Sequence, residues 1–154
     1  MIPLCFATTN QGKLREAQGI LSPLGYSVTG IQTFERDFHV IEDGATFAEN
    51  ALKKANACLQ WIPYAAFSDD SGLEIEALNG RPGIYSARYA GIEGPQQDAE
   101  NRHKVLNELA ATSWSNRRAR FVCSIAYCEK NMSPVLFHGT LEGYIALHEQ
   151  GNGG

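Results

Sequence analysis

The stretch PLCFATTNQGK, residues 3–13, decides how the fold begins. Pro3 to Thr8 is a short apolar run that ends in polar residues, which is typical of a buried strand. Leu14 to Leu24 then carries apolar residues at helical spacing. The chain is therefore expected to open with a strand, a turn and a helix.

Elements of both kinds continue along the chain. Thr46-Phe47-Ala48-Glu49 is a capping-box pattern, which predicts a helix that starts there and ends before Pro63. The other expected elements are a strand over 26–31, a helix over 95–111, a strand over 119–127, a turn over 131–134 and a partner strand over 135–147. This mixture predicts an α/β fold with a partly antiparallel sheet.

Ser68-Asp69-Asp70-Ser71-Gly72 is a polar, acidic segment between two apolar ones. Short strands are expected over 65–67 and 73–78, and the polar segment between them is expected to form a turn.

Length and composition describe one globular domain. The chain has 154 residues, of which 44% are hydrophobic and 19% charged. A net charge of −4 opposes broad binding to nucleic acid. Arg117, Arg118 and Arg120 are interpreted as solvated cations at a strand end, with nucleic-acid contact as the alternative. The longest apolar run, Trp61 to Phe67, is far shorter than the roughly 20 residues that span a bilayer, so no membrane contact is expected. Without a secretory signal pattern, a cytoplasmic location is expected.

The four cysteines, Cys5, Cys58, Cys123 and Cys128, have neither C-x-x-C spacing nor a zinc-ligand pattern. We interpret them as reduced thiols of the core, with a disulfide or a zinc site as alternatives.

Thr8-Thr9-Asn10-Gln11-Gly12-Lys13 lies where the first strand gives way to the first helix. A helix N-terminus offers free N–H groups to an anion, and Lys13 adds a positive charge. The segment lacks the Walker A pattern, because Leu14 follows the lysine. The alternative is that Asn10 only caps the helix and Lys13 is only solvated.

Asp69 and Asp70 are adjacent carboxylates, whose repulsion requires a cation or hydrogen-bond donors nearby. Mg²⁺ is a candidate, with Glu42 as a further ligand from the acidic turn that precedes the capped helix. The alternative is an Asx-type turn beside a solvated Glu42. On the capped helix, side-chain pairs i,i+4 are expected between Glu49 and Lys53 and between Asn50 and Lys54.

Together, segments 7–13, 42–51, 69–73 and 82–91 resemble the non-canonical purine nucleoside triphosphate pyrophosphatases, the inosine and xanthosine triphosphate pyrophosphatase family. The resemblance runs from about Leu4 to Gly154 with the motifs in the family's order. It implies a two-lobed fold, an elongated mixed β-sheet flanked by helices, with a central substrate cleft. It also implies a homodimer that hydrolyses ITP, dITP or XTP to the monophosphate and pyrophosphate, with Mg²⁺ as cofactor.

The resemblance also assigns roles to single residues. Asp70 and Lys13 are the implied catalytic residues, with Asp70 as the general base, and Glu42 and Asp70 are the implied Mg²⁺ ligands. The implied substrate-binding residues are Thr8, Thr9, Asn10, Gln11, Gly12, Lys13, Lys54 and Ser71.

The carboxyl end departs from the family pattern. In the family, a segment like Gly151-Asn152-Gly153-Gly154 leads into further motifs that recognise the 6-oxo purine, and these motifs are missing from the sequence. We therefore expect one domain over 1–154 that is truncated, with its phosphate and metal residues present and its base recognition incomplete. Two alternatives stay open: an inactive remnant that binds nucleotide, and a related pyrophosphatase that acts on pyrimidine or modified nucleotides.

Overall fold

A computed structural model describes residues 1–151, so of the glycine-rich segment only Gly151 lies within the described residues. The helices and strands, in chain order, are β1 (Ile2–Phe6), α1 (Gln11–Leu21), β2 (Tyr26–Gly30), α2 (Phe47–Cys58), β3 (Ala66–Ile75), α3 (Gln97–Glu108), β4 (Arg118–Cys128) and β5 (Val135–Tyr144). The predicted order of elements is confirmed, with one difference at β3.

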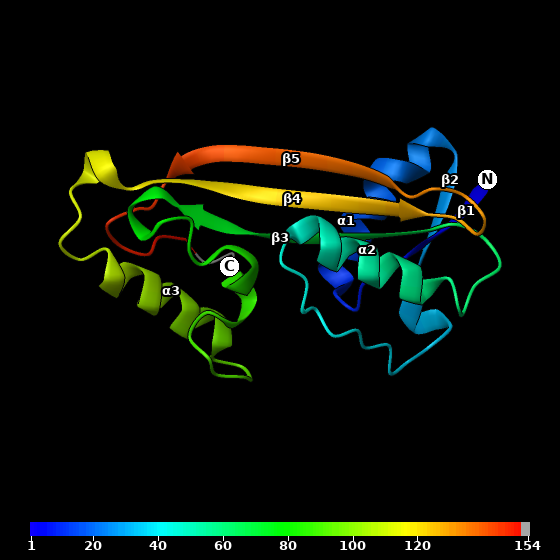
Figure 1. Cartoon of the computed structure of the whole chain (residues 1–154), viewed down its shortest axis with the longest axis horizontal. Coiled ribbons are helices and arrows are strands. Elements are labelled where there is room, and N and C mark those ends of the chain that lie inside the picture. Colours follow the sequence, from blue (N-terminus) through cyan, green and yellow to red (C-terminus); the bar gives the residue numbers. More distant parts are fainter. Residues whose placement is uncertain (152–154) are drawn as a thin grey trace. The chain divides into compact units, whose positions relative to one another are not determined.

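The strands form one sheet in the order β2-β1-β3-β4-β5. Strand β1 pairs in parallel with both of its neighbours. In Figure 1 the arrow of β4 points opposite to those of β3 and β5, so the sheet is mixed. The α/β class with a partly antiparallel sheet is thus confirmed.

Contacts within the chain divide it into two compact units. The first comprises Met1–Asp70 and Ser124–His138, and the second comprises Ser71–Cys123 and Gly139–Gly154. The single, truncated domain over 1–154 stays a prediction.

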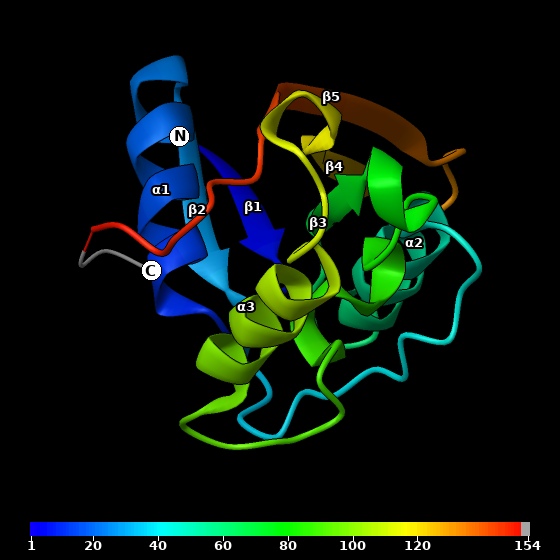
Figure 2. The same cartoon turned by 90° about the vertical axis from the view of Figure 1, so that its left-hand side faces the viewer.

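In the first unit, β1 has a buried face on each side, because successive side chains of a strand point to opposite faces. Leu4 and Phe6 belong to one apolar cluster, against which Leu14 of α1 packs. Cys5 belongs to the other cluster, together with Cys58 of α2. Figure 2 shows α1 and α2 on opposite sides of the parallel strands, as right-handed crossovers from β1 to β2 and from β2 to β3 require.

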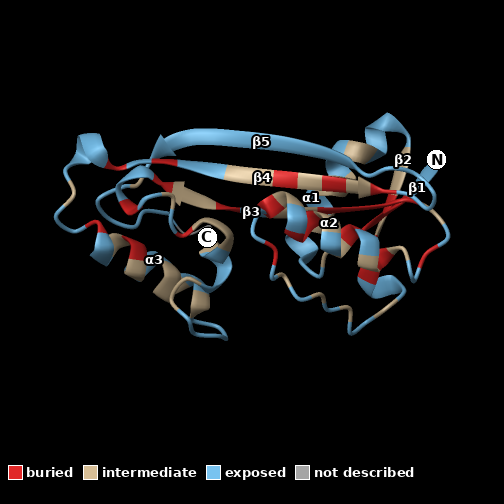
Figure 3. Cartoon of the chain, in the orientation of Figure 1, coloured by how far each residue is buried: buried red, intermediate tan, exposed pale blue. Residues whose placement is uncertain are grey.

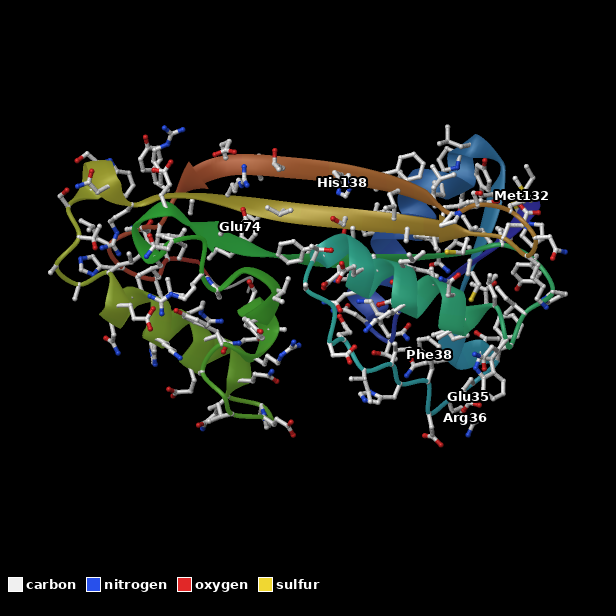
Figure 4. All side chains as sticks on the ribbon, in the orientation of Figure 1. Glu35, Arg36, Phe38, Glu74, Met132 and His138 are labelled. Carbon is white, nitrogen blue, oxygen red and sulfur yellow. The ribbon has the colours of Figure 1, made fainter. Side chains whose placement is uncertain are left out.

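The second of these clusters extends beyond regular structure. Phe38, labelled in Figure 4, packs against it from the segment before α2. The Cys58 thiol donates a hydrogen bond to Cys5 over an Sγ–Sγ distance of 3.4 Å. This hydrogen bond, and then burial, raise the pKa of Cys58, so its thiol stays protonated. Cys128 is also buried and Cys123 is half-buried, so all four cysteines are free and three of them lie in the core, as expected.

The turn predicted over Ser68–Gly72 is wrong. This segment is the middle of β3, which runs without a break from Ala66 to Ile75. Asp69 and Asp70 within it take their partners, Lys13 and Asn50, from distant parts of the chain, which local sequence does not show.

The second unit has its own core of Ile75, Leu78, Val105, Leu109 and Ala119. Glu74, labelled in Figure 4, accepts hydrogen bonds from the Arg120 guanidinium at 2.8 Å.

Strand β5, the last strand of the sheet order, is exposed along its whole length (Figure 3). No helix within residues 1–151 is long and apolar enough to cross a membrane.

Arg117 corrects the interpretation of the three arginines as solvated. Its side chain is only 2% exposed. The guanidinium donates to the carbonyl oxygens of Leu109 at 2.7 Å, Thr112 at 3.3 Å, Ile145 at 2.9 Å and Ala146 at 3.0 Å. Arg117 therefore ties the chain after α3 to the chain after β5 within the second unit.

We expect Arg117→Ala to lower the free energy of unfolding by about 2–4 kcal/mol, because it leaves buried carbonyl oxygens without donors and opens a cavity. Chemical denaturation measures this. The control Arg118→Ala removes an exposed arginine from β4 and should change the free energy by no more than about 0.5 kcal/mol. Equal effects of the two substitutions would show that the Arg117 hydrogen bonds do not stabilise the fold.

Candidate functional site

The loop between β1 and α1 is shaped by the cap of the helix. Asn10 is the N-cap residue, and its Oδ1 accepts hydrogen bonds from the backbone N–H groups of Gly12 at 2.8 Å and Lys13 at 3.1 Å. A Cβ on Gly12 would lie 3.1 Å from that oxygen, so glycine lets the cap close tightly. The hydroxyl of Thr8 accepts from the N–H of Asn10 at 3.2 Å. A phosphate at this terminus therefore competes with Asn10 for the two capped amides.

This loop lies at a topological switch point, where successive strands are added on opposite sides of β1. Strand β1 stands between β2 and β3, and its two neighbours are reached by connections on opposite faces. In open α/β sheets, ligands bind outside the carboxyl ends of the strands at such a switch point. Phe67 of β3 lies beside the end of β1, because its carbonyl accepts from the N–H of Ala7 at 2.8 Å. Asp69 and Asp70 therefore follow just beyond the end of β1.

The two adjacent carboxylates take partners from opposite faces of the sheet. Asp69 Oδ2 lies 2.7 Å from Nζ of Lys13, on α1. Asp70 Oδ2 accepts a hydrogen bond of 3.0 Å from Nδ2 of Asn50, on α2. Alternation along β3 separates the two charges, and each receives a donor from the helix on its own side. These donors ease the repulsion between Asp69 and Asp70.

Lys13 is more than a solvated residue of the first turn. Its side chain is 41% exposed, whereas that of Asp69 is 13% exposed. Asn10 caps the helix as the alternative stated, but Lys13 forms an ion pair with β3, which the alternative did not include. Gln11, next to it, donates from Nε2 to Oε1 of Gln32 at 3.1 Å.

The segment before α2 carries two acidic residues, each paired with a lysine of the helix. Glu42 Oε2 lies 3.2 Å from Nζ of Lys54. Lys53 forms a hydrogen bond with Asp43. This hydrogen bond lowers the pKa of the Asp43 carboxyl. Glu42 is therefore not simply solvated, contrary to the alternative.

The i,i+4 pairs expected on α2 are wrong, because the partners lie elsewhere. The Glu49 side chain accepts from the backbone N–H of Ala45 at 2.7 Å, while the Glu49 N–H donates to Thr46 Oγ1 at 3.1 Å. Both lysines turn to the segment before the helix. Asn50 is buried, at 1% exposure, and bonds to Asp70 rather than to Lys54.

Asn50 is the site residue that sequence reasoning missed. A signal for it existed, because position 50 lies on the same helix face as the apolar positions 47, 51 and 58. A polar side chain on a core-facing stripe is a sign of a specific buried partner.

Two further predicted site residues are Thr9 and Ser71. Thr9 is exposed in the loop before α1. Ser71 follows Asp70 along β3, is exposed and belongs to the second unit. Among residues 1–151, no group of three or more histidine, cysteine or acidic side chains is placed to hold a metal ion. A metal held by one or two carboxylates and by substrate phosphates is compatible with this finding, and that is how Mg²⁺ is usually bound.

The sequence and the fold match known proteins along nearly the whole chain. The model of the Ham1 family matches residues 4–154. A dITP/XTP pyrophosphatase of Halalkalibacterium halodurans is 45% identical over 148 residues, which are 96% of this chain and 75% of that protein. Another from Desulforamulus reducens is 44% identical over 151 residues, 98% of this chain and 74% of that protein. The structure of a HAM1 protein from Coxiella burnetii superposes with a TM-score of 0.88 at 39% identity, covering 100% of this chain and 78% of that one. The chain belongs to the Ham1 family, and the resemblance found in its motifs is confirmed.

Proposed function

We propose that this protein hydrolyses non-canonical purine nucleoside triphosphates such as dITP, ITP and XTP to the monophosphate and pyrophosphate. One observation carries the proposal: Asp69 and Asp70 lie just beyond β1, joined to Lys13 of α1 and Asn50 of α2. Relatives more than 40% identical over nearly the whole chain are named dITP/XTP pyrophosphatases, which supports the substrate class.

The lysines of the site are held by carboxylates before any substrate binds. Lys13 pairs with Asp69, and Lys54 pairs with Glu42. A triphosphate brings several negative charges, for which both ammonium groups can exchange their carboxylate partners. Each lysine then remains paired throughout binding.

Mg²⁺ fits the oxygen ligands that the site offers on the α2 side of the sheet. Glu42 and Asp70 offer carboxylate oxygens, which are the ligands this ion prefers, and the substrate phosphates complete its coordination. When bound there, the ion would offset negative charge on the phosphoryl oxygens. Glu42 is freed for this role when Lys54 turns to a phosphate.

The reaction adds water across the bond between the α and β phosphates. The water oxygen forms a bond to the α phosphorus. The bond from this phosphorus to the bridging oxygen breaks, and pyrophosphate leaves with the bonding electron pair. Asp70 takes the proton of the attacking water, a role typically worth about 10²–10⁴-fold in rate. Lys13 and Lys54 stabilise the charge that develops on the phosphate oxygens. The α1 N-terminus, with Thr8 and Asn10, positions the phosphate chain.

The remaining expectations are part of the same proposal. Ser71 contacts the substrate next to the general base. Thr9, Gln11 and Gly12 contribute to the phosphate loop. The homodimer stays a prediction from the resemblance, and the cytoplasmic location stays a prediction from the sequence, which lacks a secretory signal pattern.

Turnover of defined nucleotides tests the proposal directly. Purified protein with Mg²⁺ should release pyrophosphate from dITP, ITP and XTP, with kcat/KM well above the value for GTP or UTP, and chelation of the metal should abolish the reaction. Ion-exchange chromatography of the products identifies monophosphate and pyrophosphate. Binding of ITP without turnover favours the inactive remnant, and preference for UTP or dTTP favours the pyrimidine alternative.

Removal of the Lys13 charge tests its placement on the phosphate chain. We expect Lys13→Gln to lower kcat/KM for ITP by about 10²–10³-fold, the usual loss for one donor that stabilises developing charge. The matched control is Lys130→Gln, which changes an exposed lysine in the same unit and should leave kcat/KM within twofold of the parent. A Lys13→Gln enzyme that matches the control excludes Lys13 from the phosphate site.

A further inference from the structure

Asn50 is the buried polar side chain of α2 whose amide has a partner at each end. Its Oδ1 accepts a hydrogen bond of 2.8 Å from the backbone N–H of Gly44. Its Nδ2 donates a hydrogen bond of 3.0 Å to Oδ2 of Asp70. With 1% exposure, the side chain has no access to water that could replace either partner.

The donor and acceptor ends of this amide cannot be exchanged. The backbone N–H of Gly44 can only donate, so the atom of Asn50 that faces it must be the carbonyl oxygen. The NH₂ group must then face Asp70, where an ionised carboxylate can only accept. The hydrogen bonds thus fix both the amide and the rotation of the Asp70 carboxyl group.

Gly44 is shaped to receive Asn50. A Cβ at this position would lie 2.7 Å from Oδ1 of Asn50 and 2.9 Å from Cβ of Glu49. Both distances are shorter than non-bonded atoms tolerate, so only glycine lets the backbone come this close to the amide. Glu42 stands two residues earlier on the same segment, and its carboxylate is held by Lys54.

We propose that Asn50 is a positioning residue that sets the Asp70 carboxylate against the segment that carries Glu42. The inference rests on the proposed function, because it concerns the two carboxylates that would bind the metal. Asn50 does not touch the substrate in this account. It joins β3 to the segment before α2 through one rigid amide, so the two carboxylates keep a fixed spacing when Lys54 leaves Glu42.

The substitution Asn50→Asp tests this role with almost no change in shape. The oxygen that faces Gly44 still accepts its hydrogen bond, but an oxygen replaces the NH₂ group opposite Asp70 Oδ2. We expect kcat for ITP to fall about 10–100-fold, the usual loss when a group that orients a metal ligand is removed, with a smaller change in KM. Asn56→Asp is the matched control, because Asn56 is an exposed asparagine on the same helix, and it should leave both constants within twofold.

Metal binding without turnover provides the second readout. Mn²⁺ titrated alone and followed by electron paramagnetic resonance should bind Asn50→Asp about 10–100-fold more weakly than the parent and Asn56→Asp. Gly44→Ala should weaken Mn²⁺ binding in the same way, because its methyl group displaces the amide from the other end. Thermal melting shows whether Asn50→Asp folds. If it does not, the Mn²⁺ affinity of Gly44→Ala alone tests the positioning role.

The outcomes separate this inference from the proposed function. A parent that hydrolyses ITP, with Asn50→Asp or Gly44→Ala matching its kcat and its Mn²⁺ affinity, overturns the positioning role and leaves the function intact. A parent that binds Mn²⁺ but hydrolyses no triphosphate ends the proposed function, whereas weaker binding by the two variants still supports the role of Asn50. A parent that neither binds Mn²⁺ nor turns over overturns both.

Discussion

The site depends on one constraint, the alternation of side chains along β3. Asp69 and Asp70 are adjacent in sequence, and a turn at this place would leave their charges side by side. In a strand they point to opposite faces, and each finds its own donor, Lys13 for Asp69 and Asn50 for Asp70. The strand therefore gives two identical groups two different environments, which allows them to play different parts in one reaction.

The topology of the parallel strands supplies those donors. Right-handed crossovers place α1 on one face and α2 on the other, so a residue of each helix can reach β3 just beyond the end of β1. The same crossovers bring the capped start of α1 to that place, with Asn10 holding the amides of Gly12 and Lys13. The start of α1 and the two carboxylates are thus neighbours because of the order of the strands, although some 60 residues separate them in the sequence.

The sequence predicted correctly those features whose hydrogen-bond partners lie within a few residues of one another. The capping box at Thr46 and the cap at Asn10 are formed as expected, because their partners lie within a few residues. The turn predicted over Ser68–Gly72 is wrong because Asp69 and Asp70 find their partners in distant residues. The interpretation of Arg117 as solvated is wrong for the same reason. Its acceptors lie both before β4 and after β5, so the folded chain buries this charge. The family resemblance assigned roles to Lys13, Glu42 and Asp70, which stay predictions, whereas the hydrogen bonds by which Asn50 joins Asp70 to Gly44 are visible only in the folded structure.

The central claim is that Asp70 and Asp69 have different tasks despite their adjacency. The most direct measurement is the ratio of kcat values for pyrophosphate release from ITP by Asp70→Asn and Asp69→Asn, made in parallel. Loss of a general base predicts a fall of about 10²–10⁴-fold for Asp70→Asn. Asp69→Asn keeps an oxygen that can accept from Lys13, so its kcat should fall less than tenfold. Equal losses, or a larger loss for Asp69→Asn, would contradict the separation of the two carboxylates by β3.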